Sequence, residues 1–201
     1  MDSKTEQSRS RYNQIAGNYD DSYDGRFTQP YNQFLCDHLS VAAGDAVLDV
    51  ACGNGRLLRM LSRKAAIHAY GVDVSEEMIQ TAKRDQPDAV FCVSPADRLN
   101  FPDGTFDFVT VCCAFHHFSK PDAFMREAKR VLKPDGKLVL AEISPGAVIR
   151  WLDNLLIPRM NMGDVKIYKI EELLAFFHHA GFDHVTHVKQ GSMVIVEGIN
   201  K

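Results

Sequence analysis

Five short segments of the chain are apolar nearly throughout. Such runs are typical of strands covered on both faces, because regular alternation with polar residues is expected only where one face of a sheet meets water. Turn or helix signals bound each segment. We therefore predict strands at Ala46–Cys52, Ile67–Val74, Ala89–Val93, Phe106–Cys113 and Lys137–Ile143.

Helical patterns separate these strands. The stretch 75–85 starts at Ser75, a favoured N-cap residue, and the stretch 120–132 has apolar residues at helical spacing until the sequence Lys-Pro-Asp-Gly at 133–136. Alternating strands and helices imply right-handed crossovers. The pattern predicts an α/β fold with a Rossmann-like, doubly wound sheet that is mostly parallel.

The last third of the chain has a different pattern. A helix is expected from Ser144-Pro145 to Pro158, with an apolar stripe that Ile157, Met160 and Met162 extend, and a second helix at 170–180. The runs 184–189 and 192–198 predict an antiparallel hairpin at the sheet edge. The segment 144–165 is a candidate lid over an acceptor site, or a helix packed on the core or on a second subunit.

The whole chain, 1–201, is expected to form one domain, with residues 1–40 as an N-terminal helical cap. The net charge of −3 gives no electrostatic reason to expect a nucleic-acid partner. No apolar run approaches the roughly 20 residues that span a bilayer, and the polar N-terminus does not resemble a signal peptide. The five cysteines form no CxxC pair, which favours reduced thiols in a cytoplasmic protein. Adjacent Cys112 and Cys113 should point to opposite faces of their strand.

The stretch "VLDVACGNGR" ends the first predicted strand in a glycine-rich turn. Ligands bind beyond the C-terminal ends of the strands in an open parallel sheet, and glycine allows the backbone to approach them closely. The dinucleotide pattern GxGxxG fails here, because Leu58 stands at the third glycine position. Asp49 would repel a pyrophosphate but attract a cation. The turn therefore favours a positively charged, nucleoside-like ligand.

Two further acids follow the next two strands. Asp73 ends the second predicted strand, where a carboxylate can accept hydrogen bonds from both ribose hydroxyls. Asp97 follows the third strand, where it can accept from an adenine amino group. Each acid also has a simpler interpretation, since Asp73 could cap the following helix and Asp97 could be an ordinary turn residue.

Four segments carry a family resemblance: "VLDVACGNGRL", "GVDVSEEMI", "SPADRLNFPDGTFDFVTVCCAFHHF" and "EAKRVLKPDGKLVL". In this order and spacing they closely resemble class I S-adenosylmethionine-dependent methyltransferases. Within that class the chain is most similar to the small-molecule group that includes ubiquinone and menaquinone biosynthesis enzymes. The resemblance spans about Tyr12 to Leu140. One departure is Ala51, which replaces the first glycine of the family pattern D-x-G-x-G-x-G.

The resemblance implies S-adenosylmethionine as cofactor and S-adenosylhomocysteine as product. It also implies that the N-terminal segment folds over the cofactor, with Tyr12 or Tyr19 facing the methionyl side and Arg11 or Arg26 a weaker candidate for its carboxylate. Gly55 would allow the close turn, and Ala114 would touch the methionyl part through its backbone. The expected cofactor-binding residues are Tyr19, Asp49, Gly53, Gly55, Asp73, Val74, Met78, Ala96, Asp97 and Ala114.

Candidate catalytic residues follow the fourth strand. His116 or His117 could act as a general base, which is needed only if the acceptor must lose a proton early; either could instead pack or cap. The segment "CCAFHHF" lacks the N/D-P-P-Y pattern of enzymes that methylate nucleic-acid amino groups and the metal-binding acids of catechol-type enzymes. We therefore expect a small-molecule acceptor, no nucleic acid and no metal.

Two other functions remain open. A nicotinamide-dependent dehydrogenase shares the sheet architecture, although the failed GxGxxG pattern opposes it. A non-catalytic subunit that binds S-adenosylmethionine for a partner enzyme would carry the same cofactor residues. A homodimer is also open, because the apolar stripe after Ser144 could pack on a second copy.

Overall fold

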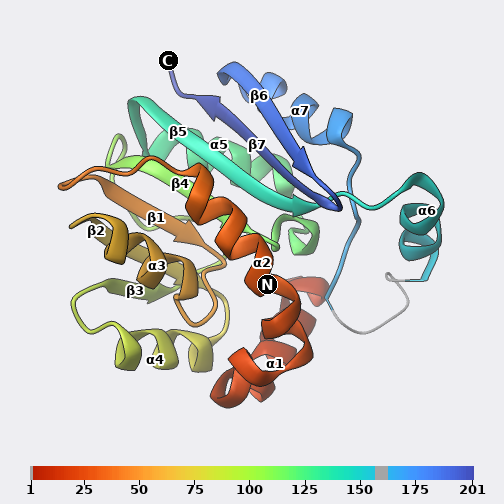
Figure 1. Cartoon of the computed structure of the whole chain (residues 1–201), viewed down its shortest axis with the longest axis horizontal. Coiled ribbons are helices and arrows are strands. Elements are labelled where there is room, and N and C mark those ends of the chain that lie inside the picture. The colour runs from red at the N-terminus through yellow and green to blue at the C-terminus, as the bar shows by residue number, and fades with distance from the viewer. Residues whose placement is uncertain (1, 157–162) are drawn as a thin grey trace.

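The computed structural model describes residues 2–156 and 163–201 (Figure 1). Ile157, Pro158, Met160 and Met162, to which the sequence analysis assigned the end of a helix and its apolar extension, lie outside the described residues.

A mixed sheet of seven strands forms the centre of the molecule (Figure 1). The spatial order is β3-β2-β1-β4-β5-β7-β6, and only β7 runs antiparallel to both of its neighbours. This order confirms the Rossmann-like sheet and the C-terminal antiparallel hairpin. The strands are β1 (Ala46–Val50), β2 (His68–Asp73), β3 (Val90–Val93), β4 (Phe106–Cys112), β5 (Leu132–Ile143), β6 (Asp183–Gln190) and β7 (Met193–Ile199).

Helices cover both faces of the sheet and also lie at the C-terminal ends of its parallel strands (Figure 1). Ser75 caps α4 as predicted, because its Oγ accepts a hydrogen bond from the amide of Met78. The helices are α1 (Ser3–Ile15), η1 (Ala16–Asp21), α2 (Tyr23–His38), α3 (Arg56–Lys64), α4 (Glu76–Asp85), η2 (Phe115–His117), α5 (Pro121–Val131), α6 (Ala147–Leu156) and α7 (Ile170–His179).

Two hydrophobic cores lie on opposite faces of the sheet. Successive side chains of a strand point to opposite faces, so Val47 and Leu48 of β1 belong to different cores. Val47 lies in the core formed with α2, α3 and α4, whereas Leu48 lies in the core formed with α5 and α7. Covering both faces explains why the central strands β1, β2 and β4 are largely apolar, whereas the residues of the edge strands β3 and β6 are mostly exposed.

The N-terminal segment is tied to α4 by polar contacts. Arg9 donates to Glu76 through Nη2 at 2.7 Å, and the Oγ of Ser75 donates to Asn13 at 2.6 Å. Asn13 therefore holds the residue that caps α4. These contacts place α1 beside the C-terminal ends of the parallel strands (Figure 1).

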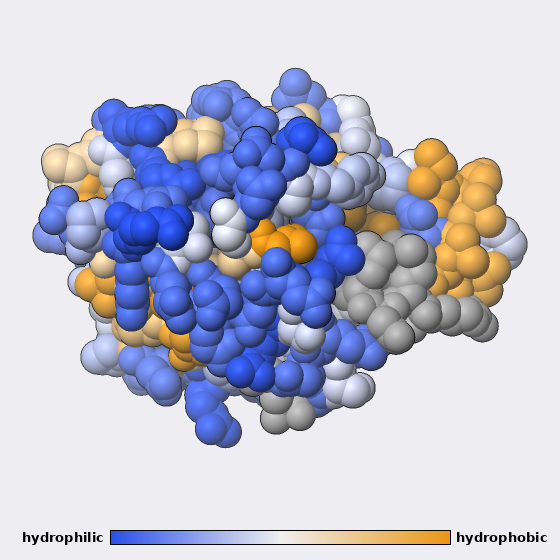
Figure 2. Space-filling model, turned by 90° about the horizontal axis from the view of Figure 1, so that it is seen from below, coloured by the Kyte–Doolittle hydropathy of each residue, from blue (hydrophilic) through white to orange (hydrophobic). Residues whose placement is uncertain are grey.

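Helix α6 projects from the body of the molecule (Figure 1) and forms the apolar protrusion on the right of Figure 2. None of the described residues of α6 is buried, and Trp151 is 64 % exposed. The apolar stripe predicted from the sequence is thus present, but in this structure it faces outward.

Gly71 in β2 allows a test of how tightly side chains pack near the C-terminal ends of the parallel strands. A Cβ at this position would lie 2.6 Å from Cδ1 of Phe91 and 2.8 Å from Sγ of Cys52. We expect Gly71→Ala to lower the free energy of unfolding by about 1–3 kcal/mol, as overpacking does in well-packed cores. Urea unfolding measures this change. Gly17→Ala is the matched control, because a Cβ there meets nothing within 4 Å, and equal losses in both variants would contradict the packing argument.

Candidate active site

The glycine-rich turn after β1 contains three residues in the left-handed region. Ala51, Gly53 and Gly55 have φ angles of 57°, 53° and 76°. A Cβ on Gly53 would meet nothing within 4 Å, whereas one on Gly55 would lie 2.9 Å from Cζ of Phe91. Gly53 therefore leaves space for a ligand, and Gly55 allows the turn to pack closely on β3, as the sequence predicted for a tight turn. Ala51 adopts a conformation that is uncommon for a residue with a side chain.

Asp73, at the end of β2, connects this turn to the next one. Its carboxylate accepts a hydrogen bond from the amide of Gly53 at 2.9 Å and another from the amide of Ser75 at 2.9 Å. Burial raises the pKa of Asp73, although these amide donors act in the opposite direction. A carboxylate has about four lone-pair sites, so the two amides leave Asp73 able to accept from a ligand.

Asp49 lies near the C-terminal end of the central strand β1. It is buried, with 2 % of its surface exposed. The hydroxyl of Thr110 donates to it at 2.8 Å. Burial raises the pKa of Asp49 to about 7, and the charge of Asp73 acts in the same direction, while the Thr110 hydrogen bond opposes the shift. A cation placed beside Asp49 would favour its ionised form.

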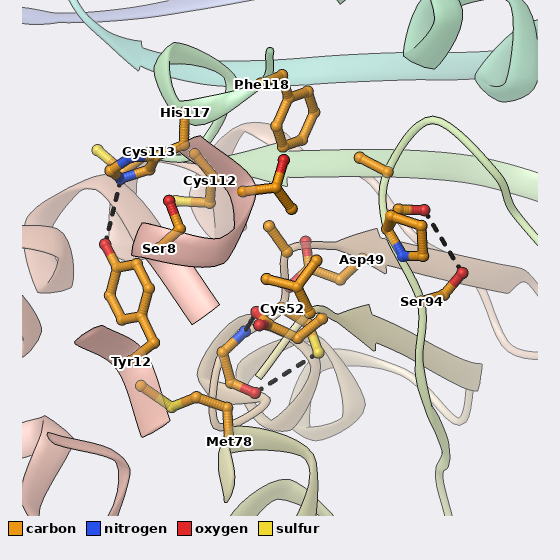
Figure 3. Close-up of a pocket in the computed structure, with 18 of the residues that line it drawn as sticks. Ser8, Tyr12, Asp49, Cys52, Met78, Ser94, Cys112, Cys113, His117 and Phe118 are labelled. Atoms are coloured by element: carbon orange, nitrogen blue, oxygen red, sulfur yellow. Dashed lines mark hydrogen bonds between the residues drawn. The ribbon is translucent and has the colours of Figure 1, made fainter. Parts of the chain in front are cut away.

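A pocket lies at the C-terminal ends of the parallel strands, beneath α1 and beside η2 (Figure 3). Sequence-predicted residues that border it are Tyr19, Asp49, Gly53, Asp73, Val74, Met78, Ala96, Asp97, Ala114 and His117. Gly55 and His116 are not among the described residues that border it. The cofactor-binding role of each bordering residue remains a prediction, and the pocket brings nearly the whole set together.

The two candidate catalytic histidines differ in position. His117 borders the pocket, and its Nε2 lies 3.2 Å from the hydroxyl of Tyr12 (Figure 3). His116 points away from the pocket, and its Nδ1 lies 2.9 Å from a carboxylate oxygen of Glu142. Of the two, only His117 is placed to contact a molecule in the pocket.

The N-terminal segment supplies one wall of the pocket. Thr5, Ser8 and Tyr12 on α1 border it, spaced so that they share one face of the helix. Tyr19 in η1 borders it too, and its hydroxyl lies 3.1 Å from Oγ1 of Thr28. Both Tyr12 and Tyr19 thus border the pocket, while a role of the N-terminal segment as a cap over the cofactor stays a prediction.

Sequence reasoning missed several polar residues on the pocket wall, three of which lie on α2 and α3. Thr28 and Asn32 lie one turn apart on α2, and Arg56 is the first residue of α3. The i, i+4 spacing of Thr28 and Asn32 was an available signal, but the sequence does not say which face of α2 meets the pocket. The predicted ligand arginines lie elsewhere: Arg11 is paired with Asp24, and Arg26 is not among the described lining residues.

Cys112 and Cys113 both border the pocket, although strand alternation predicted opposite faces. The difference arises because β4 ends at Cys112 and Cys113 has a φ angle of 51°, so the alternation stops between them. All five cysteines are free thiols, which agrees with the expectation of reduced cysteine. Burial raises the pKa of both pocket thiols well above the ordinary value, so they are neutral at pH 7.

The described residues of the candidate lid do not cover this pocket. None of the described residues of 144–165 borders it, and α6 projects outward (Figure 1). A lid function for this segment stays a prediction. No helix in the described ranges 2–156 and 163–201 is long and apolar enough to cross a membrane.

The polar atoms of the pocket suit a nucleoside that carries a positive charge. Three carboxylates, those of Asp49, Asp73 and Asp97, border it. Within the described part of the chain, Oγ of Ser8 and Oδ1 of Asn54 are buried on its wall without a hydrogen-bond partner. Buried polar groups are normally satisfied, so these two atoms are exceptions to the usual pattern.

Comparison with known families decides the class of this site. A family model described as "Methyltransferase domain" matches residues 48–140, which run from β1 through the glycine turn to β5. Residues 48–140 therefore form a domain of the class I S-adenosylmethionine-dependent methyltransferase family. The chain has the fold expected of that class, and its carboxylates and open glycine turn fit S-adenosylmethionine as the family's cofactor.

Curated relatives of this chain include two demethylmenaquinone methyltransferases. The Thermotoga maritima enzyme is 40% identical over 102 residues, covering 50% of this chain and 44% of the relative. The Renibacterium salmoninarum enzyme is 31% identical over 148 residues, covering 72% of this chain and 62% of the relative. The chain therefore matches about half of the length of these relatives.

A solved structure shows the fold over nearly the whole chain. It is a complex between the Haloferax volcanii Trm112 methyltransferase activator and a methyltransferase, with a TM-score of 0.80 and 21% identity. The match covers 94% of this chain and 97% of the other. At this identity the similarity concerns the fold alone.

Asp73 gives a test of the cofactor site. We expect Asp73→Asn to lower the affinity for S-adenosylmethionine about tenfold or more, because a charge-assisted hydrogen bond is worth about 1.5–3 kcal/mol. Calorimetry measures the affinity, and thermal unfolding checks that the variant is folded. Asp103→Asn is the matched control, because Asp103 is exposed and lies outside the pocket. Unchanged affinity in a folded Asp73→Asn protein would remove Asp73 from the site.

Asp49 predicts a pH dependence of cofactor binding. Its pKa of about 7 means that the carboxyl is protonated below neutral pH in the free protein. A cationic ligand favours the ionised form, so affinity should rise as pH increases toward 7 and level off above it. Below the pKa the change should reach about tenfold per pH unit. Calorimetry between pH 5.5 and 8 measures this dependence.

Asp49→Asn provides the control for this dependence. Since the amide cannot titrate, the variant should show weaker binding that changes little between pH 5.5 and 8. A full pH dependence in Asp49→Asn would assign the titration to another group, and Asp73 is the nearest candidate because its pKa is also raised by burial.

Proposed function

We propose that this chain transfers a methyl group from S-adenosylmethionine to a small-molecule acceptor and releases S-adenosylhomocysteine. The observation that carries the proposal is the grouping of Asp49, Asp73 and Asp97 around the open turn at Gly53. Three carboxylates on one pocket oppose a pyrophosphate and favour a cation, so this grouping also argues against a nicotinamide dinucleotide.

Each part of the pocket has a proposed role. Asp73 accepts from the ribose hydroxyls, while Ala96 and Asp97 hold the adenine; Lys120, 2.8 Å from Asp97, fixes that carboxylate in place. Asp49 and the turn at Gly53 face the amino-acid part. When bound, S-adenosylmethionine supplies a methyl group on a sulfonium that already carries its leaving group, so the protein contributes chiefly by alignment.

The acceptor is proposed to bind at the α1 and η2 end of the pocket. Tyr12, His117 and Phe118 border this end, and the Tyr12–His117 contact of 3.2 Å places two polar groups where they can orient an acceptor (Figure 3). Ser8 adds a buried hydroxyl without a hydrogen-bond partner in the described residues. The names of the demethylmenaquinone methyltransferases favour a small aromatic acceptor, and the net charge of −3 gives no support for a nucleic acid.

The function is tested in two steps on the purified chain. Calorimetry should show binding of S-adenosylmethionine and S-adenosylhomocysteine at micromolar concentrations or below, and far weaker binding of NAD. Incubation with radiolabelled S-adenosylmethionine and a panel of quinols, phenols and small amines should then label at least one acceptor. Tyr12→Phe should reduce turnover more than cofactor affinity, because Tyr12 lies at the acceptor end.

Two outcomes would contradict this proposal. NAD binding as tight as that of S-adenosylmethionine would restore the dehydrogenase alternative. Cofactor binding with no labelled product across the panel, followed by activity once a partner protein is added, would favour the non-catalytic subunit.

A further inference from the structure

Three potential metal ligands converge behind the acceptor end of the pocket. His116 and His117 are adjacent in η2, and their ring centroids are 4.2 Å apart. Asp164 comes from the segment between α6 and α7, and its Oδ1 lies 3.4 Å from Nε2 of His116 and 3.1 Å from Nδ1 of His117. All three side chains are at most 13 % exposed.

These separations match those around a small divalent ion. One ligand atom from each of His116, His117 and Asp164 lies within 4.8 Å of the other two. A tetrahedral zinc ion with bonds of about 2.0–2.2 Å separates its ligand atoms by about 3.3–3.6 Å. The two measured N–O separations are close to this value, so an ion could enter with small side-chain movements.

The surrounding residues hold the ligands in a suitable orientation. Glu142 accepts hydrogen bonds from the amide of Phe115 at 2.7 Å and lies 2.9 Å from Nδ1 of His116. An ionised Glu142 requires the proton of His116 on Nδ1, which leaves Nε2 facing Asp164. A carboxylate that bonds the second ring nitrogen is the usual arrangement behind a metal-ligating histidine.

Asp164 is held on the other side by the backbone. The amide of Val165 donates to the carbonyl of His116 at 2.9 Å, and the amide of Lys166 donates to the same carbonyl at 3.3 Å. These bonds join the segment after residue 162 to η2. The main-chain hydrogen bonds of the two residues that follow Asp164 therefore hold its carboxylate near the histidines.

His117 has an unused nitrogen directed into the cluster. Its Nδ1 is buried and has no hydrogen-bond partner among residues 2–156 and 163–201, because the nearby Asp164 oxygen lies outside hydrogen-bond geometry.

We propose that His116 Nε2, His117 Nδ1 and Asp164 Oδ1 bind one divalent transition-metal ion of the zinc type. Two imidazoles and a carboxylate favour zinc or a similar first-row ion over magnesium, which prefers oxygen ligands. Three protein ligands leave a tetrahedral ion one position for a water molecule. The sequence analysis expected no metal, because the segment "CCAFHHF" contains no metal-binding acid. Asp164 is far from the histidines along the chain and gives no recognisable spacing.

Metal binding would also determine which group donates the hydrogen bond between His117 and Tyr12 at the pocket. With Nδ1 of His117 on the ion, its proton must be on Nε2, which lies 3.2 Å from the hydroxyl of Tyr12. Tyr12 would then accept this bond and have its own O–H free to donate into the pocket. The proposed ion is thus linked to the acceptor end through His117 and Tyr12.

Zinc binding to the full chain tests the site without any need for activity. The purified protein is stripped with a chelator and titrated with Zn²⁺ against a chromophoric competitor. We expect one equivalent of zinc to bind and to raise the thermal unfolding temperature, as a ligand of the folded state must. His116→Ala and Asp164→Asn should each weaken binding about 100-fold, and Glu142→Gln about 10–100-fold. Mg²⁺ at the same concentration should leave the thermal unfolding temperature unchanged.

His187→Gln is the matched control, because His187 is exposed on β6, outside the cluster. It should bind zinc as the unchanged protein does. Co²⁺ substitution guards against binding by the five cysteines, since thiolate ligands add a sulfur-to-metal charge-transfer band that the proposed ligands cannot give. Absence of zinc binding, thiolate bands, or full zinc affinity in a folded Asp164→Asn protein would each overturn the proposal. In that case the cluster is a buried network of ion pairs with His116 protonated.

Discussion

The hydrogen bonds that the carboxylate of Asp73 accepts from the amides of Gly53 and Ser75 determine the geometry of the pocket floor. They join the turns that follow two neighbouring strands, so the glycine-rich turn and the start of α4 cannot move independently. Ser75 in turn caps α4 and is held by Asn13 of α1. One carboxylate at the end of β2 therefore connects the sheet, a helix cap and the N-terminal wall of the site.

Features with a local signal could be predicted from the sequence. The apolar runs predicted the five strands of the parallel part, and the central strands are apolar because both of their faces are buried. The runs 184–189 and 192–198 predicted the hairpin, although β6 is mostly exposed. The glycine turn and Asp73 could be located because parallel strands end at a common edge. The observed strand bounds differ from the predicted ones mostly by one or two residues, except that β5 begins at Leu132, directly after α5.

Features that depend on packing between distant segments could not be predicted. Thr28, Asn32 and Arg56 reach the pocket because of the way α2 and α3 pack, and the sequence does not show that rotation. The cluster of His116 with Asp164 requires two segments to meet that are separated by β5 and α6. The outward position of α6 also differs from expectation: an apolar stripe predicts burial against something, but it does not say against what.

The position of β7 inside the sheet has a consequence for how the chain folds. β7 is the last strand along the chain, yet it lies between β5 and β6 and pairs with both. The strands β1 to β4 can assemble from residues 46–112, whereas one edge of β5 has no strand to pair with until residues 193–199 are available. Such non-local pairing is slow, because a long loop must close first. Until then the edge of β5 exposes unpaired backbone groups, which makes it a site for misassociation between incompletely folded copies.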